Sequence, residues 1–166
     1  MQIPDTLAFL AGNWRLHRSL TDHRSGVSGV FTGTASFAPV PGEQGRLRYR
    51  EQGELRFGQH TGPAWRELLW LAAPAGTADV RFADGRPFYQ ADFRTGRWQA
   101  THDCGSDVYQ VTYHVLDAGQ LTERWRARGP GKHYVSVTTL VRDVDEVSGA
   151  GQRSGRREAA APGLTH

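Results

Sequence analysis

Residues 102–115, with the sequence HDCGSDVYQVTYHV, concentrate side chains that can do chemistry. The segment holds two histidines, two tyrosines, two aspartates and the only cysteine of the chain. Imidazole, carboxylate and phenol groups serve as general acids and bases, and a thiol beside an imidazole can act as a nucleophile or a zinc ligand. The segment is therefore either a reactive cluster or an ordinary strand whose polar residues face water.

Strand alternation divides this segment between two faces. From Asp107 onward, the odd-numbered residues form the larger and more apolar face, so we predict that Tyr109 and Tyr113 point inward and His114 points outward. On the preceding strand, His102 shares a face with a tryptophan and an alanine, which places it inside or at the rim. The inward group is then a wall of hydrogen-bonding side chains.

Cys104 lies in the expected turn between these two strands. A single His-x-Cys pair falls short of the four ligands of a structural zinc site, and a nucleophilic cysteine needs a base and electropositive surroundings. The nucleophile-elbow, P-loop and zinc-protease motifs are also absent from the sequence. We predict no metal site and interpret Cys104 as a turn residue.

One carboxylate alternates with arginines in residues 120–128. The arginines must face water, which places Glu123 inside, beside Trp125. Burying a carboxylate costs several kcal/mol unless it is paired or protonated, so Glu123 needs an internal partner or a raised pKa. A structural ion pair, ligand binding and acid–base chemistry all remain open for it.

Residues 46–52 repeat this pattern, with arginines outside and Tyr49 and Glu51 inside. An inward carboxylate next to a tyrosine is unusual for a core that only packs. Gly53 follows, and a glycine inside a strand pattern predicts a β-bulge.

Two further segments have an undecided inward face. In residues 64–72, Arg66 and Trp70 share one face, but both faces carry large apolar groups. Arg66 would pair with one of the inward carboxylates if its face pointed inside. In residues 86–93 we favour Tyr89 inward.

Short segments with period-two alternation, separated by turn residues, recur along the chain. Dipeptides such as Asp84-Gly85 indicate tight hairpins. This pattern predicts an all-β fold, a roughly ten-stranded antiparallel up-and-down barrel, whose interior has room for a small ligand. The predicted strands begin near Trp14, Gly29, Arg46, Ala64, Thr77, Arg86, Arg97, Asp107, Gln120 and His133.

The first residues predict a short helix, in which Asp5 is the N-cap, Leu10 lies at the end and Gly12 stops it. Such a helix could plug one end of the barrel. The composition changes after the last strand, so we expect a barrel domain at residues 1–145 and a flexible, Gly/Arg/Ala-rich tail at residues 146–166.

The formal net charge is +3, and Lys132 is the only lysine. No basic stripe is interleaved with aromatic residues, which argues against nucleic-acid binding. No apolar run approaches the ~18 residues of a membrane helix, and the N-terminus lacks the basic region of a signal peptide. We expect a soluble cytoplasmic protein with a small-molecule ligand, no nucleic-acid partner and no membrane partner, and a homodimer remains open.

The segment FLAGNW places Gly12 and Trp14 directly after the expected helix, and the last strand supplies Arg142. This arrangement resembles the lipocalin and fatty-acid-binding (calycin) pattern. The resemblance implies that the tryptophan packs beneath the arginine and closes the base of the barrel, a cation–π contact.

The segments FLAGNW, FADGRPFY, HDCGSDVYQVTY and GPGKHY resemble an uncharacterised bacterial family of calycin-like proteins over residues 7–143. Among calycin-like barrels, the ten-stranded nitrobindins imply a haem whose histidine ligand lies about six residues before the terminal arginine. That position is Ser136 here, and His133 lies further out. Haem binding therefore remains an alternative, with His133 or His102 as the ligand in place of a histidine at position 136.

We predict that the protein binds a small, partly apolar or aromatic metabolite inside the barrel. The first alternative is an enzyme of the isomerase, cyclase or hydratase type, with Glu123 or His102 as base and Tyr109 or Tyr113 as proton donor. Haem binding is the second alternative, and a purely structural role is the third. The predicted ligand-binding residues are Tyr49, Glu51, Arg66, Trp70, Tyr89, His102, Asp107, Tyr109, Tyr113, Glu123 and Trp125.

Overall fold

The computed structural model describes residues 1–144, so the predicted tail at 146–166 lies outside the described residues. One short helix precedes ten strands, and a single turn of 3₁₀ helix, η1, interrupts them. The elements are α1 (Thr6–Leu10), β1 (Gly12–Asp22), β2 (Val27–Pro39), β3 (Arg46–Phe57), β4 (His60–Ala73), η1 (Pro74–Gly76), β5 (Thr77–Phe82), β6 (Pro87–Ala91), β7 (Arg97–Cys104), β8 (Asp107–Asp117), β9 (Gln120–Gly129) and β10 (Lys132–Arg142).

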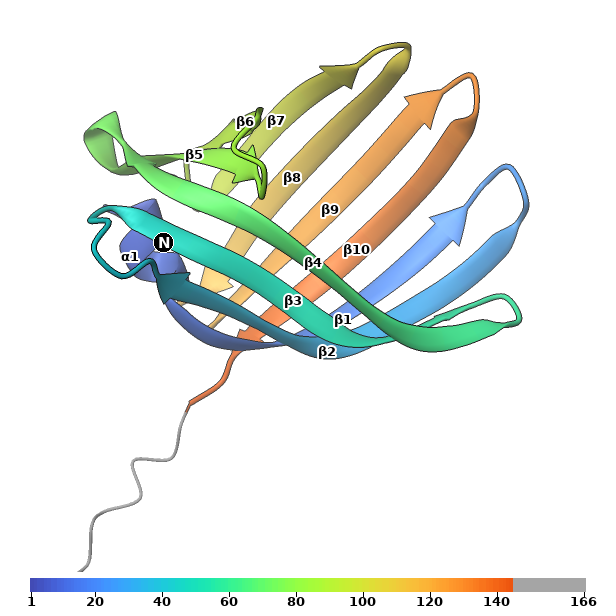
Figure 1. Cartoon of the computed structure of the whole chain (residues 1–166), viewed down its shortest axis with the longest axis horizontal. Helices are drawn as coiled ribbons and strands as arrows, with labels where there is room; N and C mark the ends of the chain where they lie inside the picture. The colour runs from blue at the N-terminus through green and yellow to red at the C-terminus, as the bar shows by residue number, and fades with distance from the viewer. Residues whose placement is uncertain (145–166) are drawn as a thin grey trace, which may run out of the picture.

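All ten strands form one antiparallel sheet that curls into a nearly closed barrel (Figure 1). The strand order is β6-β5-β4-β3-β2-β1-β10-β9-β8-β7, so the first and last strands pair in the middle. The two ends of the sheet, β6 and β7, are consecutive in the chain but share no ladder. The predicted ten-stranded up-and-down barrel is confirmed.

The alternation that predicted the faces of β9 and β8 matches their burial. Glu123 and Trp125 are buried, with the arginines of β9 exposed. Tyr113 is buried and Tyr109 half-buried on the inner side of β8, whereas His114, also half-buried, lies on the opposite face of the strand. A row of arginines cannot be desolvated together, and this forces the orientation of such strands.

The predicted bulge at Gly53 is wrong. The ladders from β3 to β2 and to β4 run past this residue without a register shift, and Gly53 pairs with Gly33. A Cβ on Gly33 would lie 2.1 Å from the carbonyl oxygen of Gln52, and one on Gly53 would lie 2.2 Å from that of Thr32. Glycine is therefore needed here because the two backbones approach too closely for a side chain.

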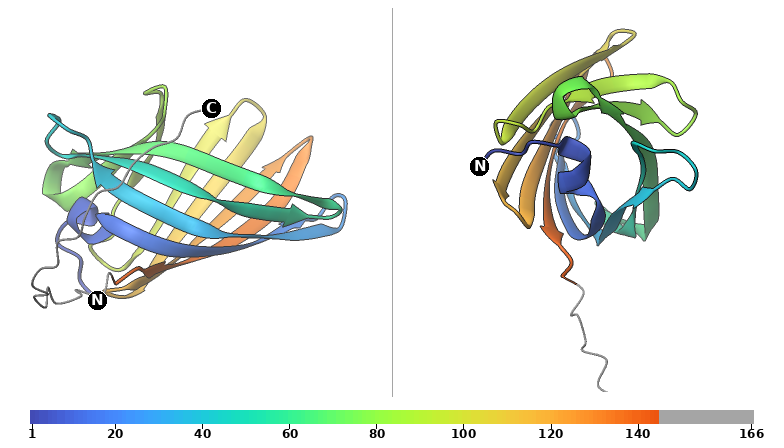
Figure 2. Two further views of the ribbon diagram at one scale, coloured as in Figure 1. Left: turned by 60° about the horizontal axis from the view of Figure 1, so that its bottom comes forward. Right: turned by 90° about the vertical axis from the view of Figure 1, so that its left-hand side faces the viewer.

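The short helix α1 lies across one end of the barrel (Figure 2). The side chain of Asp5 accepts a hydrogen bond from the amide of Ala8 at 2.9 Å, as expected of an N-cap. Arg142 stacks over Trp14, with the guanidinium carbon 4.2 Å from the ring centroid, and donates a 2.8 Å hydrogen bond to the carbonyl of Ala11. These contacts join the helix to the first and last strands.

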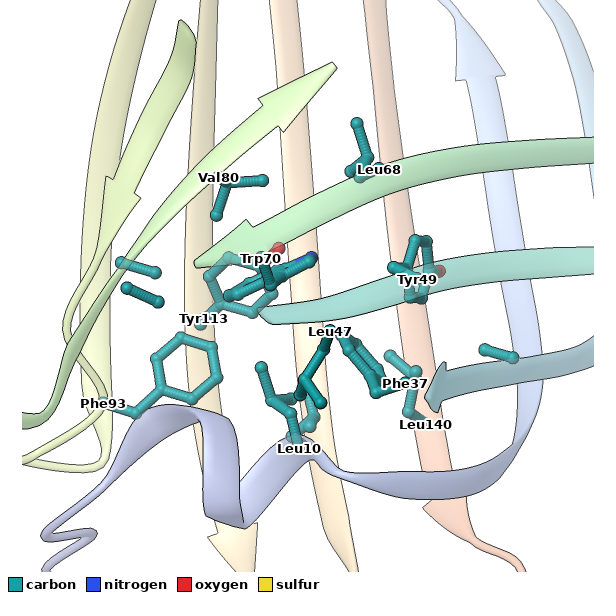
Figure 3. Packing of buried hydrophobic residues seen from close by; sticks show 14 of the residues in the cluster. Leu10, Phe37, Leu47, Tyr49, Leu68, Trp70, Val80, Phe93, Tyr113 and Leu140 are labelled. Carbon is teal, nitrogen blue, oxygen red and sulfur yellow. The ribbon is translucent and has the colours of Figure 1, made fainter. Parts of the chain in front are cut away.

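The half of the barrel next to α1 is filled with side chains. Figure 3 shows Leu10 of the helix, Trp70 of β4 and Phe93 of the connection between β6 and β7 meeting in this space. Little room remains for a ligand at this end. Among the described residues, no helix has the length and apolar character needed to span a membrane.

Candidate ligand-binding cavity

A cavity of about 510 Å³ occupies the half of the barrel away from α1. It is lined by the far end of β1, by Leu55 and Phe57 at the end of β3, and by the hairpin between β9 and β10. The volume lies within the range of small-molecule sites, roughly 300–1,000 Å³.

Aromatic side chains form one wall of this cavity. Phe88 stacks on Trp125 with ring centroids 5.3 Å apart and planes 11° apart. A register shift between Val80 and Arg81 lets Phe88 and the adjacent Tyr89 both pack against Trp125. The irregularity in the β5–β6 ladder therefore supplies an aromatic surface that strict alternation would have turned outward.

Arg18 on the floor of the cavity forms a buried ion pair with a carboxylate behind it. Arg18 on β1 donates two hydrogen bonds to Glu51 on β3, at 2.7 and 2.8 Å, and a third of 2.7 Å to the hydroxyl of Thr138 on β10. Burial acts to raise the pKa of Glu51, but the hydrogen bond from Arg18 and the charges of Arg66 and Arg18 outweigh it and lower this pKa to about 2. Tyr49 also donates a hydrogen bond to Glu51. Glu51 is therefore an ionised structural group.

Arg18 was missed from the sequence, although a signal for it existed. It shares the inward parity of Trp14 and Leu16 on the same strand. A face that begins with the buried tryptophan predicts an inward arginine two positions after the leucine. The predicted partner, Arg66, does point inward, but it contacts Glu51 through a single hydrogen bond of 3.3 Å.

The second carboxylate, Glu123, lies behind the cavity floor. Its Oε1 accepts hydrogen bonds from the indole of Trp125 at 2.6 Å and from the hydroxyl of Tyr113 at 3.0 Å. Its Oε2 lies 3.8 Å from Arg18 and 4.0 Å from Arg66. The hydroxyls of Tyr89 and Tyr113 are 2.6 Å apart, and burial raises the pKa of both tyrosines. The two phenol groups that extend this hydrogen-bond network from Glu123 are therefore neutral.

Charged groups also gather at the mouth. Lys132 lies 3.0 Å from Asp107 and donates a 2.6 Å hydrogen bond to the hydroxyl of Tyr109. These two hydrogen bonds raise the pKa of Lys132. The rings of His23 and His133 lie beside this group with centroids 4.8 Å apart.

The structure divides the predicted ligand-binding residues into separate groups. Four aromatic residues pack in the closed core, two carboxylates lie behind the floor, Asp107 is at the rim, and His102 packs edge-on against Phe88 at 5.1 Å. The four core residues are Tyr49, Trp70, Tyr89 and Tyr113. The three predicted residues that line the cavity are Arg66, Tyr109 and Trp125.

Within residues 1–144, no three potential metal-binding side chains cluster together. Ser136, at the position of the implied haem ligand, is buried on the cavity wall opposite Leu20 and Trp125. A serine hydroxyl does not replace the imidazole of that arrangement. The residue at this position therefore does not fit the implied haem site.

A family described as "Family of unknown function (DUF6314)" matches residues 10–142. The chain belongs to this family. The match covers all ten strands of this DUF6314 protein. No curated protein sequence matches the chain.

Several solved structures resemble the DUF6314 barrel. The S-type phycobiliprotein lyase CPES from Guillardia theta has a TM-score of 0.61 at 11% identity, over 88% of this chain and 95% of the lyase. A DUF3598 protein of unknown function from Nostoc punctiforme has a TM-score of 0.44 at 13% identity, over 86% of this chain and 51% of the other. A redesigned β-barrel, mFAP1, bound to DFHBI, has a TM-score of 0.44 at 15% identity, over 82% of this chain and 97% of the design. The lyase shares the fold of this protein.

Proposed function

We propose that this DUF6314 protein binds a small, partly apolar or aromatic molecule in the open half of its barrel. The observation that carries the proposal is the cavity of about 510 Å³, in which Phe88, Trp125 and other aromatic side chains face a few polar groups. Apolar walls with a small number of convergent polar groups are typical of small-ligand sites.

Two features support the further inference that the fold is related to the calycins. Arg142 covers Trp14 at the closed end, as the resemblance implied. The opposite end contains the cavity, so the barrel has one closed end and one end that can admit a ligand. The exposed free thiol of Cys104 supports a cytoplasmic, reducing location as part of the same proposal.

Binding is favoured over acid–base catalysis by the placement of the candidate catalytic groups. Of these groups, only Tyr109 lines the cavity. Glu123 is 4% exposed and already accepts two hydrogen bonds, and His102 packs against Phe88. A general base must come within hydrogen-bond reach of the proton that it removes. A ligand in this cavity meets the arginines and the aromatic wall before it meets those groups.

The proposal is tested with N-phenyl-1-naphthylamine, a neutral aromatic probe whose fluorescence rises in apolar surroundings. Ser136 lies on the cavity wall, and the next residue, Val137, is 38% exposed on the outer face of the same strand. Ser136→Trp would place an indole in the cavity, whereas Val137→Trp adds the same side chain outside. The two variants form a matched pair.

We expect the wild type and Val137→Trp to bind the probe with similar Kd values, and Ser136→Trp to bind it at least about tenfold more weakly. Far-ultraviolet circular dichroism checks that each variant is folded. A wild type that does not bind the probe, or equal binding by a folded Ser136→Trp, would overturn the proposal. Displacement of the probe by members of a metabolite collection then identifies the natural ligand class. An absorption spectrum after haem addition tests the haem alternative, and a Soret shift would favour it.

A further inference from the structure

The two arginines on the cavity floor differ in how fully their N–H groups are used. A guanidinium has five N–H donors. Arg18 places three of them in hydrogen bonds of 2.7 to 2.8 Å. Arg66 makes one hydrogen bond, at 3.3 Å to Glu51, and its Nε is buried without a partner. Its side chain is nevertheless one-third exposed.

The exposed part of Arg66 faces the cavity. Arg18 and Arg66 both line it, whereas the carboxylates of Glu51 and Glu123 lie behind them and are 4–5% exposed. The one acidic residue in the lining is Asp22, whose carboxylate accepts hydrogen bonds from the hydroxyl of Ser25 and the amide of Arg24 at the rim. The floor therefore presents positive charge and unused donors to a ligand.

The charges of Arg18 and Arg66 are matched in number by the carboxylates of Glu51 and Glu123, so what remains unused at Arg66 is its N–H donors. Glu51 is held bidentately by Arg18, so its nearer oxygen is shared between two guanidiniums. Glu123 is 4.0 Å from Arg66, too far for a hydrogen bond. A cationic ligand group offers no acceptor to these donors, and an anionic oxygen accepts a stronger hydrogen bond from a guanidinium than a neutral oxygen does. A carboxylate matches both the charge and the planar pair of N–H donors.

We propose that Arg66 binds the carboxylate of an aromatic or otherwise apolar acid, whose body lies against Phe88 and Trp125. This inference rests on the proposed function, because it assigns the head-group site within the same cavity. The ligand class is an amphipathic organic acid: the acidic group sits on the floor and the apolar body extends toward the mouth.

The test compares 2-naphthoate with 2-naphthamide, which share the ring system and differ in charge. Both compete with N-phenyl-1-naphthylamine in the full-length protein. Arg66→Gln removes the charge and keeps a polar side chain, and Arg66→Lys keeps the charge but loses the planar pair of donors. Arg48→Gln is the matched control, because Arg48 is exposed on the outer face of the neighbouring strand.

We expect wild type to prefer the acid over the amide by about tenfold or more. Arg66→Gln should weaken binding of 2-naphthoate by about ten- to a hundredfold, the loss typical of a charge-assisted hydrogen-bonded pair. Binding of 2-naphthamide and of the neutral probe should change by less than about twofold. Arg66→Lys should retain part of the preference, and Arg48→Gln should behave as wild type.

Equal affinity of the wild type for the acid and the amide would overturn the inference, and so would a folded Arg66→Gln that loses both ligands equally. If Arg66→Gln does not fold, the wild-type preference and its reduction in Arg66→Lys decide the matter. Failure of the wild type to bind the neutral probe is a different outcome, because it overturns the cavity proposal itself. Probe binding without any preference for the acid leaves the cavity and removes the head-group site.

Discussion

Replacing Arg18 by methionine tests whether the ion pair on the cavity floor stabilises the barrel. The change removes a side chain that joins β1 to Glu51 on β3 and to Thr138 on β10. It leaves the carboxylate of Glu51, 4% exposed, with the longer hydrogen bond from Arg66 and the one from Tyr49. An uncompensated buried charge costs about 3–5 kcal/mol when its partner is removed.

The pKa of Glu51 gives an independent magnitude. Lowering it from 4.5 to about 2 corresponds to roughly 3 kcal/mol of stability at neutral pH. Because the folded pKa is below the unfolded one, this stabilisation is present above about pH 4.5 and is lost as the pH falls toward 2. We therefore expect Arg18→Met to lower the free energy of unfolding by about 3 kcal/mol at pH 7. Between pH 5 and pH 3 the difference from wild type should narrow by roughly 1–2 kcal/mol.

Urea unfolding followed by tryptophan fluorescence at pH 7, 5 and 3 measures both quantities. Arg15→Met is the matched control, because Arg15 lies on the outer face of the same strand and its contact with Asp143 is 3.9 Å long and exposed. Its effect should stay below about 0.5 kcal/mol. The double variant Arg18→Met/Glu51→Gln removes the charge and should recover much of the loss. A loss below about 1 kcal/mol at pH 7, or a double variant as unstable as the single one, would refute the reasoning.

Two further substitutions test the closed end and the curvature of the sheet. Arg142→Met should lower the free energy of unfolding by about 1–2 kcal/mol, because it removes a cation–π contact and a hydrogen bond to the helix end. Its control is Arg124→Met, on the exposed face of β9. Equal losses of stability in the two variants would contradict the role of Arg142 in closing this end of the barrel. Gly33→Ala should cost at least about 2 kcal/mol, because its Cβ would lie 2.1 Å from the facing backbone. Gly131→Ala, whose Cβ would meet nothing within 4 Å, should have little effect in the same urea experiment, and a tolerated Gly33→Ala would show that the strands can separate there.

The inward face was predicted most reliably for strands whose other face carries residues that cannot be buried together. The arginines of β9 left only one orientation for Glu123 and Trp125. Arg66 was undecided because both faces of its strand carry large apolar residues, so alternation alone does not choose between them. Tertiary closure of the sheet makes that choice.

The residues of the candidate site were harder to predict than the fold, because their positions along the barrel axis matter as well as the face on which they lie. Alternation identifies inward residues, but it does not say which of them meet in the filled half and which line the open half. Trp70 and Tyr113 point inward as predicted, yet they lie in the closed core, whereas Phe88 reaches the cavity through a register shift. The close approach at Gly33 and Gly53 likewise depends on sheet coiling rather than on local sequence.

The order of the strands has a consequence for how the molecule assembles. Nine ladders join the ten described strands, and every ladder except β1–β10 joins strands that are neighbours in the chain. The first and last strands, whose pairing includes Trp14 with Arg142, can meet only after almost the whole barrel has been synthesised. Arg18 crosses that same junction to reach Thr138. The cavity is lined from both β1 and β10, so it cannot be enclosed before the final strand pairs with the first. If the proposed function holds, ligand binding would report completion of folding.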